Sequence, residues 1–226
     1  MAFSHSPNIV TDGVVLCLDA ADKNSYIGSG TTWSDLSPSG NDGTLSAAAI
    51  GTDVPGSMDF NGSSEYLTVT NSTSLQIAAN ITYDWWFKTT STSGEDWFFS
   101  NNIGSTPLVM SSIDNSGGIQ FQFTDDDGTS VSGKYTDTST LTGWHHIALV
   151  SSGTTATLYT DTVQKITDTD GSFDTITLTT DFEIARDTRA DRYFAGSMDI
   201  FRIYNKALTP KEVLQNFNAQ RSRFGV

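Results

Sequence analysis

Apolar and polar residues alternate along most of the chain, and turn residues interrupt the alternation about every ten positions. Residues 81–88, ITYDWWFK, show the pattern most clearly. Every odd-numbered position is apolar or aromatic, whereas Asp84 and Trp86 fall on the other side. Successive side chains of a strand point to opposite faces, so this spacing predicts strands with one face in a core. The sequence predicts an all-β chain of about a dozen strands.

The alternation gives way to helical spacing near the C-terminus. Residues 209–212, TPKE, match a capping box with threonine at the N-cap, proline at the first helical position and glutamate at the third. Val213, Leu214 and Phe217 then recur at the spacing of one helix face. We therefore expect one short helix to close the chain.

A chain of 226 residues, 37% of them hydrophobic, can bury one sizeable core, and no linker or repeat divides it. Residues 1–226 are predicted to form a single domain, with a short helix and tail at about residues 209–226. Residues 20–55 are rich in serine, glycine and threonine, which predicts a long loop over the sheets. The lone Cys17 excludes an internal disulfide and predicts a small buried side chain.

The formal net charge of −14, from 26 acidic and 12 basic residues, excludes two classes of partner. Nucleic acids require a basic surface, and anionic membranes repel an acidic one, so we expect neither to bind. The N-terminus has neither the basic start nor the apolar stretch of a signal peptide. We therefore expect the protein to avoid the ordinary secretory route.

Four segments match the sequence signatures of one fold family. They are residues 15–45, which begin VLCLDAADKNSY, MDFNGSSEYLTV at 58–69, GWHHIALVSSGTTATLYTD at 143–161 and YFAGSMDIFRIYNKALTPKEV at 193–213. Together they resemble the laminin-G-like, concanavalin A-like jelly-roll family. The resemblance implies an all-β, two-sheet antiparallel jelly-roll sandwich with one short C-terminal helix. It also implies that the first and last strands are neighbours.

The two ends of the chain carry a narrower resemblance. HSPNIVTDGVVLCLDAADKNSY at 5–26 and NFNAQRSRFGV at 216–226 are similar to virion proteins of marine tailed phages that carry this domain. This implies a structural virion protein, such as a capsid decoration, fibre or tail-associated subunit, assembled in the host cytoplasm. We expect it to bind other virion subunits and copies of itself, through a free tail with contacts at Arg221, Arg223 and Phe224.

Glycosidases share this jelly roll, but the sequence shows no sign of their chemistry. A retaining glycosidase needs two carboxylates about 5 Å apart, and the glucanases of this fold carry them as Glu-x-Asp-x-x-Glu on one strand. The chain has four glutamates, and no two of them lie within five positions of each other. The three histidines and Cys17 form no recognisable set of nucleophile and base. We therefore predict a domain that is not an enzyme.

One carboxylate stands on an otherwise apolar strand face, since Asp199 falls on the same side as Phe201 and Ile203. A desolvated carboxylate needs a partner, and three candidates are open. The first is a structural Ca²⁺ ion, which prefers six to eight oxygen ligands. The others are loop amides and an arginine. The family resemblance brings the last strand close to the first strand and its following loop. The predicted calcium ligands are Asp19, Asp35, Asn41 and Asp199.

Sugar binding needs an aromatic surface with polar groups beside it, on a face open to water. Trp86 and Asp84 point away from the predicted core and are the first candidates, while Gln120 and Gln122 form a second polar face. The alternative for Trp86 is that loops or a partner subunit cover it. The second predicted function is therefore a glycan-binding adhesin for host surface polysaccharide, with or without Ca²⁺.

Overall fold

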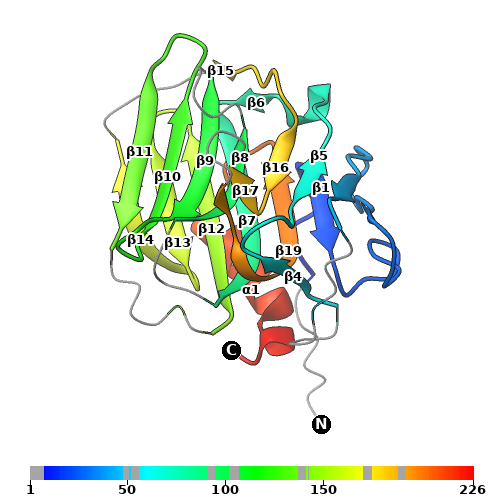
Figure 1. The fold of residues 1–226 in the computed structure, drawn as a ribbon. Helices are drawn as coiled ribbons and strands as arrows, with labels where there is room; N and C mark the ends of the chain where they lie inside the picture. Colours follow the sequence, from blue (N-terminus) through cyan, green and yellow to red (C-terminus); the bar gives the residue numbers. More distant parts are fainter. Residues whose placement is uncertain are drawn as a thin grey trace.

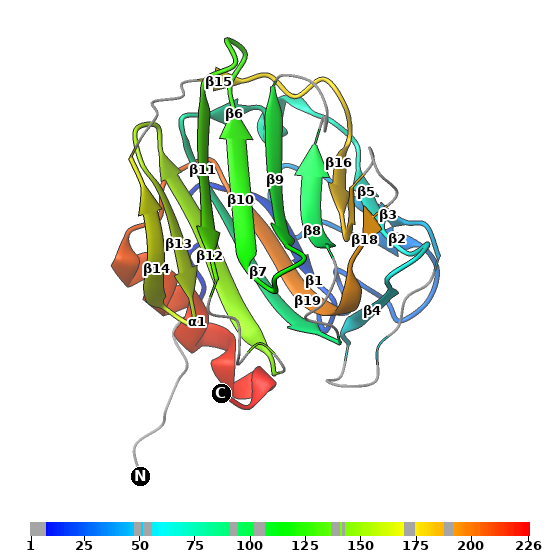
Figure 2. The same cartoon turned by 60° about the vertical axis from the view of Figure 1, so that its left-hand side comes forward.

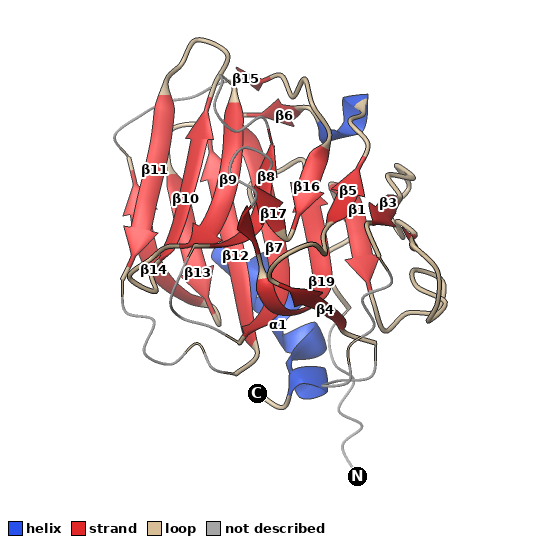
Figure 3. Ribbon diagram, viewed as in Figure 1, coloured by secondary structure: helices blue, strands red, loops and turns tan. Residues whose placement is uncertain are grey.

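The computed structural model describes residues 8–47, 51, 56–90, 95–101, 107–136, 141, 143–169, 175–187 and 192–226. In these residues two antiparallel sheets face each other and one helix follows them (Figures 1 and 3). The predicted jelly-roll sandwich with one short C-terminal helix is confirmed. The described residues hold nineteen strands, more than the sequence predicted, because several strands span only two or three residues.

The first sheet has seven strands. Its order is β1 (Val14–Asp19), β19 (Ala195–Tyr204), β7 (Asn80–Thr89), β12 (His145–Ser152), β13 (Ala156–Thr160) and β14 (Val163–Asp168), with β4 (Met58–Asn61) paired to the start of β19. β1 and β19 are antiparallel neighbours, with Asp19 opposite Ile200. The prediction that the first and last strands lie side by side is therefore confirmed.

The second sheet has eight strands. Its order is β11 (Ser130–Tyr135), β10 (Ile119–Thr124), β9 (Leu108–Ile113), β8 (Asp96–Asn101), β16 (Phe182–Ile184), β5 (Leu67–Val69), β3 (Gly43–Leu45) and β2 (Thr32–Trp33). Two short ladders join β6 (Ile77–Ala78) to β15 (Thr175–Ile176) and β17 (Arg186–Asp187) to β18 (Arg192–Tyr193), and the 3-10 turn η1 (Thr73–Leu75) precedes β6. Strands β8 to β11 face the viewer in Figure 2, and none of the described helical residues lies over them.

The facing sides of the two sheets enclose one aromatic core. Tyr83 of β7 stacks on Phe99 of β8 with 4.7 Å between ring centroids, and Trp85 meets Phe98 at 5.3 Å. Each fully buried ring adds roughly 1.5–3 kcal/mol of hydrophobic stabilisation. The odd-numbered positions of β7 thus point into the core, as the alternation predicts.

The helix α1 (Pro210–Phe224) lies behind the seven-stranded sheet in Figure 1, on the side away from the other sheet. It begins with the predicted capping box: the Thr209 hydroxyl accepts from the Glu212 amide, and the Glu212 carboxylate accepts from the Thr209 amide at 2.8 Å. Gly225 ends the helix in the left-handed conformation.

The prediction of a free C-terminal tail is wrong, because residues 216–224 are helical. No helix among the described residues is long and apolar enough to span a membrane.

Candidate functional site

The outer face of the seven-stranded sheet is covered by α1. Trp86 points to this face, as predicted, but its exposed fraction is 0%. Phe224 stacks on its indole with 4.1 Å between centroids and Phe217 with 5.5 Å, while Trp144 packs beside Phe224. The prediction of Trp86 as an open sugar platform is therefore wrong. The alternative, that Trp86 is covered, is the one observed, and the cover is the chain's own helix.

Asp84, the second candidate on this face, is a buried ion-pair residue. Its Oδ1 accepts a hydrogen bond from Arg202 Nη1 at 2.8 Å, and its Oδ2 lies 2.9 Å from His146 Nε2 and accepts from Asn216 Nδ2 at 3.1 Å. Burial raises the pKa of Asp84, but His146, Arg202 and Asn216 outweigh it and bring the pKa to about 2. Asp84 is therefore ionised, paired and closed to a ligand.

The same network ties the N-terminal segment to the helix. The Val10 amide donates to Asn216 Oδ1 at 2.9 Å, and the Tyr204 hydroxyl donates to the Val10 carbonyl at 3.1 Å. Asn216 Nδ2 also donates to the Tyr204 hydroxyl at 3.0 Å. Segments far apart in the chain meet in this network, so it fixes the position of α1 on the sheet.

Asp199 pairs with an arginine, which was the third of the open alternatives. Arg223 Nε donates to Asp199 Oδ2 at 2.8 Å, and Arg223 Nη2 donates to Asp19 Oδ1 at 2.8 Å. Burial raises the pKa of Asp199 to about 6, because Arg223 is shared with Asp19 and offsets only part of the desolvation. Arg223 and Phe224 are thus packed against the sheet. The prediction that they belong to a free tail and contact other subunits is therefore wrong. Arg221 is exposed.

Loop amides surround a different carboxylate, Asp35. Its Oδ1 accepts from the Cys17 amide at 2.7 Å, and its Oδ2 accepts from the Asn41 amide at 2.8 Å. Asn41 Nδ2 in turn donates to the Val15 carbonyl at 2.7 Å, so the loop is held against β1. The buried position predicted for Cys17 is confirmed.

The four predicted calcium ligands therefore do not fit one Ca²⁺ site. Asp19 and Asp199 face the guanidinium of Arg223, and the oxygens of Asp35 accept hydrogen bonds from backbone amides. A cation beside Arg223 would be repelled by its charge. In the part of the chain that the structure describes, no group of three or more His, Cys, Asp or Glu side chains could hold a metal ion.

The outer face of the eight-stranded sheet, in contrast, is polar, and no helix of the described residues lies over it. Cross-strand pairing places seven outward side chains in one continuous row: Ser132, Gln122, Met110, Ser100, Glu183, Thr68 and Thr44. A parallel row holds Lys134, Gln120, Ser112 and Trp97. None of these residues belongs to the core between the sheets.

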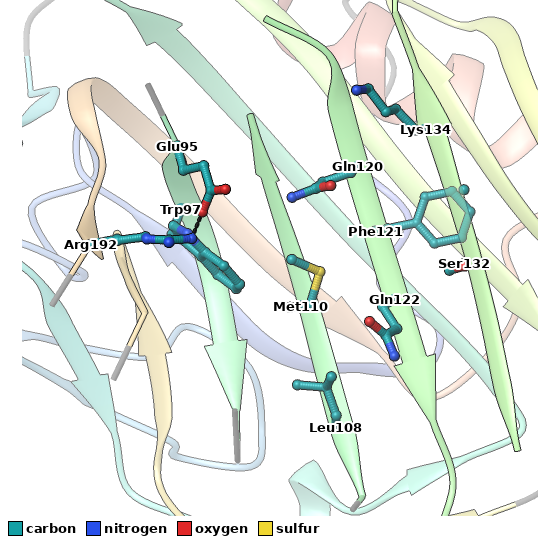
Figure 4. Close-up of a pocket in the computed structure, with 11 residues that line it drawn as sticks. Glu95, Trp97, Leu108, Met110, Gln120, Phe121, Gln122, Ser132, Lys134 and Arg192 are labelled. Carbon is teal, nitrogen blue, oxygen red and sulfur yellow. Dashed lines mark ion pairs between the residues drawn. The ribbon is translucent and has the colours of Figure 1, made fainter. Parts of the chain in front are cut away.

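A hollow of about 430 Å³ lies over these two rows (Figure 4). Trp97 and Met110, which are 3% and 6% exposed, form its floor. Gln120 Nε2 donates to Ser112 Oγ at 2.8 Å and Gln122 Nε2 donates to Thr124 Oγ1 at 3.0 Å. Their Oε1 oxygens have no donor among the described residues. The predicted polar face of Gln120 and Gln122 is therefore the part of the candidate site that lies open.

Ion pairs flank the hollow on two sides. Arg192 pairs with Glu95 next to the Trp97 indole (Figure 4). On the other side of the hollow, Lys134 pairs with Asp114. Burial opposes ionisation of Asp114, but hydrogen bonds from Lys134 and nearby amides bring its pKa to about 2. The sequence did not predict Glu95, Arg192, Asp114 and Lys134 as site residues, because only the strand register brings their segments together.

A family comparison identifies the fold class independently. Residues 60–214 match the model of the concanavalin A-like lectin/glucanases superfamily, of the laminin-G type. The chain belongs to this superfamily. The resemblance to this family is thus confirmed, although the first of the four sequence segments, residues 15–45, lies outside the matched range. A search of curated proteins found no match.

Solved structures similar to this superfamily member include binding domains of botulinum neurotoxins. The receptor binding domain of the C/D mosaic serotype has a TM-score of 0.74 at 16% identity, over 93% of this chain and 52% of that one. The serotype D ligand binding domain, in complex with N-acetylneuraminic acid, has a TM-score of 0.72 at 16% identity, over 93% and 52%. The serotype G binding domain has a TM-score of 0.69 at 18% identity, over 92% of this chain and 51% of that one. The chain spans about half the length of these domains, and identities this low show a shared fold alone.

Proposed function

We propose that this domain binds carbohydrate in the hollow on the outer face of the eight-stranded sheet. The observation that carries the proposal is the hollow itself, about 430 Å³ of open space with an apolar floor and polar walls. Sugars present apolar C–H faces and hydroxyl groups together, so such a surface matches both parts of the ligand.

Specific atoms in the hollow are available to hydroxyl groups. The Oε1 oxygens of Gln120 and Gln122 can accept hydrogen bonds, since only their Nε2 groups are engaged among the described residues. The neurotoxin domain with N-acetylneuraminic acid supports a sugar ligand on a domain of this fold.

Binding without hydrolysis fits the placement of the glutamates on this face. Glu183 lies opposite Ser100, and Glu95 precedes Ser100 by five positions on the neighbouring strand. At 3.3 Å per residue these two glutamates are roughly 16 Å apart along the strand direction, beyond the separation that retaining or inverting glycosidases use between their two carboxylates. The binding domains among the solved neighbours agree with a non-enzymatic role.

The proposal is tested by a glycan array followed by titration calorimetry on the glycans that bind. Replacing Gln120 and Gln122 together by alanine removes two acceptors, so we expect roughly tenfold weaker binding or more, with unchanged Tm. Gln164→Ala, an exposed glutamine on β14 of the other sheet, is the matched control and should bind as the parent does. A protein that retains no glycan, or an unchanged affinity in the double variant, would overturn the proposal.

We further propose that this binding domain serves as a virion subunit. The support is the resemblance of its two ends to virion proteins of marine tailed phages. Arg221 is exposed and is the predicted contact residue that we retain for a neighbouring subunit. Mass spectrometry of purified particles should find this chain at high, symmetric copy number, and its absence from particles would reject the role.

A further inference from the structure

A cluster of two tyrosines and an arginine lies beside the hollow. The guanidinium carbon of Arg186 stands 4.2 Å from the ring centroid of Tyr66 and 5.9 Å from that of Tyr193. The two tyrosine rings are 6.2 Å apart and inclined by 51°. All three side chains are half-buried, so each still reaches solvent. The sequence pattern had assigned no role to any of them.

The backbone bends sharply at the residue before Arg186. Ala185, the residue before it, has φ 65°, a left-handed conformation that non-glycine residues rarely adopt. The bend is held by hydrogen bonds from the Ala185 amide to the Phe98 carbonyl at 2.8 Å and from the Phe194 amide to the Ala185 carbonyl at 3.0 Å. It turns the chain out of β16 into the β17–β18 hairpin, where Arg186 pairs with Tyr193. Strained backbone of this kind is concentrated at binding and catalytic sites.

Arg186 makes no direct ion pair with an acidic side chain among the described residues. Among the described residues its side chain makes no ion pair and no hydrogen bond, and its Nε is buried without an acceptor. Two glutamates stand near it in the fold without a direct bond to it: Glu65 accepts a hydrogen bond from the Asn61 amide at 2.9 Å, and Glu183 accepts one from Thr68 at 3.2 Å. Burial raises the pKa of Glu183, and the nearby charge of Arg186 lowers it in part, so these two charges interact without direct contact. An arginine without a direct ion pair in the described part of the chain is unexpected, because the sequence has 26 acidic and only 12 basic residues.

The cluster is a direct neighbour of the hollow. Arg192, which lines the hollow, and Tyr193, which lines the cluster, are consecutive residues of β18. They point to opposite sides of the β17–β18 hairpin, since Arg186 faces Tyr193 and Asp187 faces Arg192. A chain of linked sugars bound in the hollow therefore meets the cluster when it crosses this hairpin.

We propose that Arg186, Tyr66 and Tyr193 form a second subsite that binds an acidic sugar unit, so that the ligand is an anionic polysaccharide. This rests on the proposed function of the hollow. The guanidinium presents a planar fork of N–H groups that matches a carboxylate or a sulfate ester, and stacking on Tyr66 holds that plane in place. The tyrosine rings pack against the apolar face of the same sugar unit.

The test compares two polysaccharides that differ only in charge, a polyuronate and its carboxyl-reduced neutral form, by titration calorimetry. A sulfated galactan and its desulfated form repeat the comparison for sulfate esters. The parent protein should bind at least one acidic form about tenfold more tightly than its neutral form, as expected for one charge-assisted bidentate contact. Arg186→Gln should abolish this preference while keeping the affinity for the neutral polymer. Arg221→Gln, an exposed arginine on α1, is the control and should keep the preference.

The outcomes distinguish failure of the acidic subsite from failure of sugar binding in the hollow. Equal binding of acidic and neutral polymers by the parent protein, or an unchanged preference in Arg186→Gln, overturns the subsite and leaves sugar binding in the hollow intact. No binding of any polymer overturns both. If Arg186→Gln lowers the Tm, Arg186→Lys replaces it: lysine keeps the charge without the fork, so the preference should fall but not vanish. A preference as strong with lysine as with arginine contradicts recognition by the planar fork.

Discussion

The two sheets of the sandwich have the same alternating construction, yet their outer faces differ. Trp86 on β7 and Trp97 on β8 both point away from the core, and both are less than 5% exposed. Trp86 is covered by aromatic side chains of α1, whereas Trp97 forms part of the floor of a hollow that no helix covers in the part of the chain that the structure describes. An outward aromatic position therefore does not by itself mark a binding face. Whether an outward aromatic side chain is open to a ligand depends on whether another part of the chain covers that face.

The charges on the two faces differ in the same way. Under α1, Asp84 and Arg202 are both fully buried and are bonded to each other and to the helix. On the open face, the pairs of Arg192 with Glu95 and of Lys134 with Asp114 include basic side chains that are 41% exposed. Buried pairs lose much stability when one partner is removed, and exposed pairs contribute little. Substitutions on the covered face should therefore change stability, and those on the open face should change binding.

The largest effect is expected from Asp84→Ala, which breaks the buried network. It leaves the Arg202 charge desolvated and uncompensated, so the free energy of unfolding should fall by about 3–5 kcal/mol. Urea denaturation followed by tryptophan fluorescence measures it. Asp127→Ala, at an exposed turn, is the control and should change stability by less than about 0.5 kcal/mol. Equal effects of the two substitutions would contradict the assignment of Asp84 as the centre of the buried network.

The next largest effect concerns pH and Asp199. Its pKa in the folded protein is about 6, above the ordinary value of 3.8, so the folded state binds more protons than the unfolded state between these values. The free energy of unfolding should therefore fall as pH rises from about 4 to above 6, by on the order of 1–3 kcal/mol for this group. Asp96, whose pKa burial also raises to about 6, adds to the fall. Asp199→Asn should reduce the fall without removing it, as urea denaturation at pH 4.5 and pH 7.5 would show. An unchanged pH dependence would contradict the raised pKa.

Apart from the neighbouring first and last strands, which the family resemblance implied, the features that the sequence predicted correctly are local ones. The alternation of residues 81–88 placed Trp85 in the core and Trp86 outside it, and the capping box at Thr209 marked the start of α1. Both depend on the geometry of a single element, so adjacent residues are enough to predict them.

The features that the sequence did not predict depend on contacts between distant elements. No pattern near Trp86 shows that Phe224, more than a hundred residues later, stacks on it. The hollow requires the register of β8, β9, β10 and β11, and a one-residue shift would turn Gln120 and Gln122 into the core. The partner of Asp199 was among the stated alternatives, because a desolvated carboxylate always needs one; that it is Arg223 follows only from where the helix ends.

A smaller effect is expected from Gln120→Ala and Gln122→Ala when stability alone is measured. Each glutamine gives up one side-chain hydrogen bond on a partly exposed surface, so the free energy of unfolding should change by no more than about 0.5 kcal/mol. The same two variants should lose glycan affinity, which separates the faces by function. A loss of stability as large as that of Asp84→Ala would show that the open face is structural as well.

The smallest effect is expected from calcium. The Tm of EDTA-treated protein should not change when Ca²⁺ is added, because Arg223 already neutralises Asp19 and Asp199. Arg223→Ala frees both carboxylates, and Ca²⁺ should then raise the Tm in proportion to the logarithm of its concentration. Asp199→Asn combined with Arg223→Ala should remove that response. A rise in Tm in the parent protein would mean that the ion displaces Arg223 from the carboxylates, and the covered face would then hold a ligand site after all.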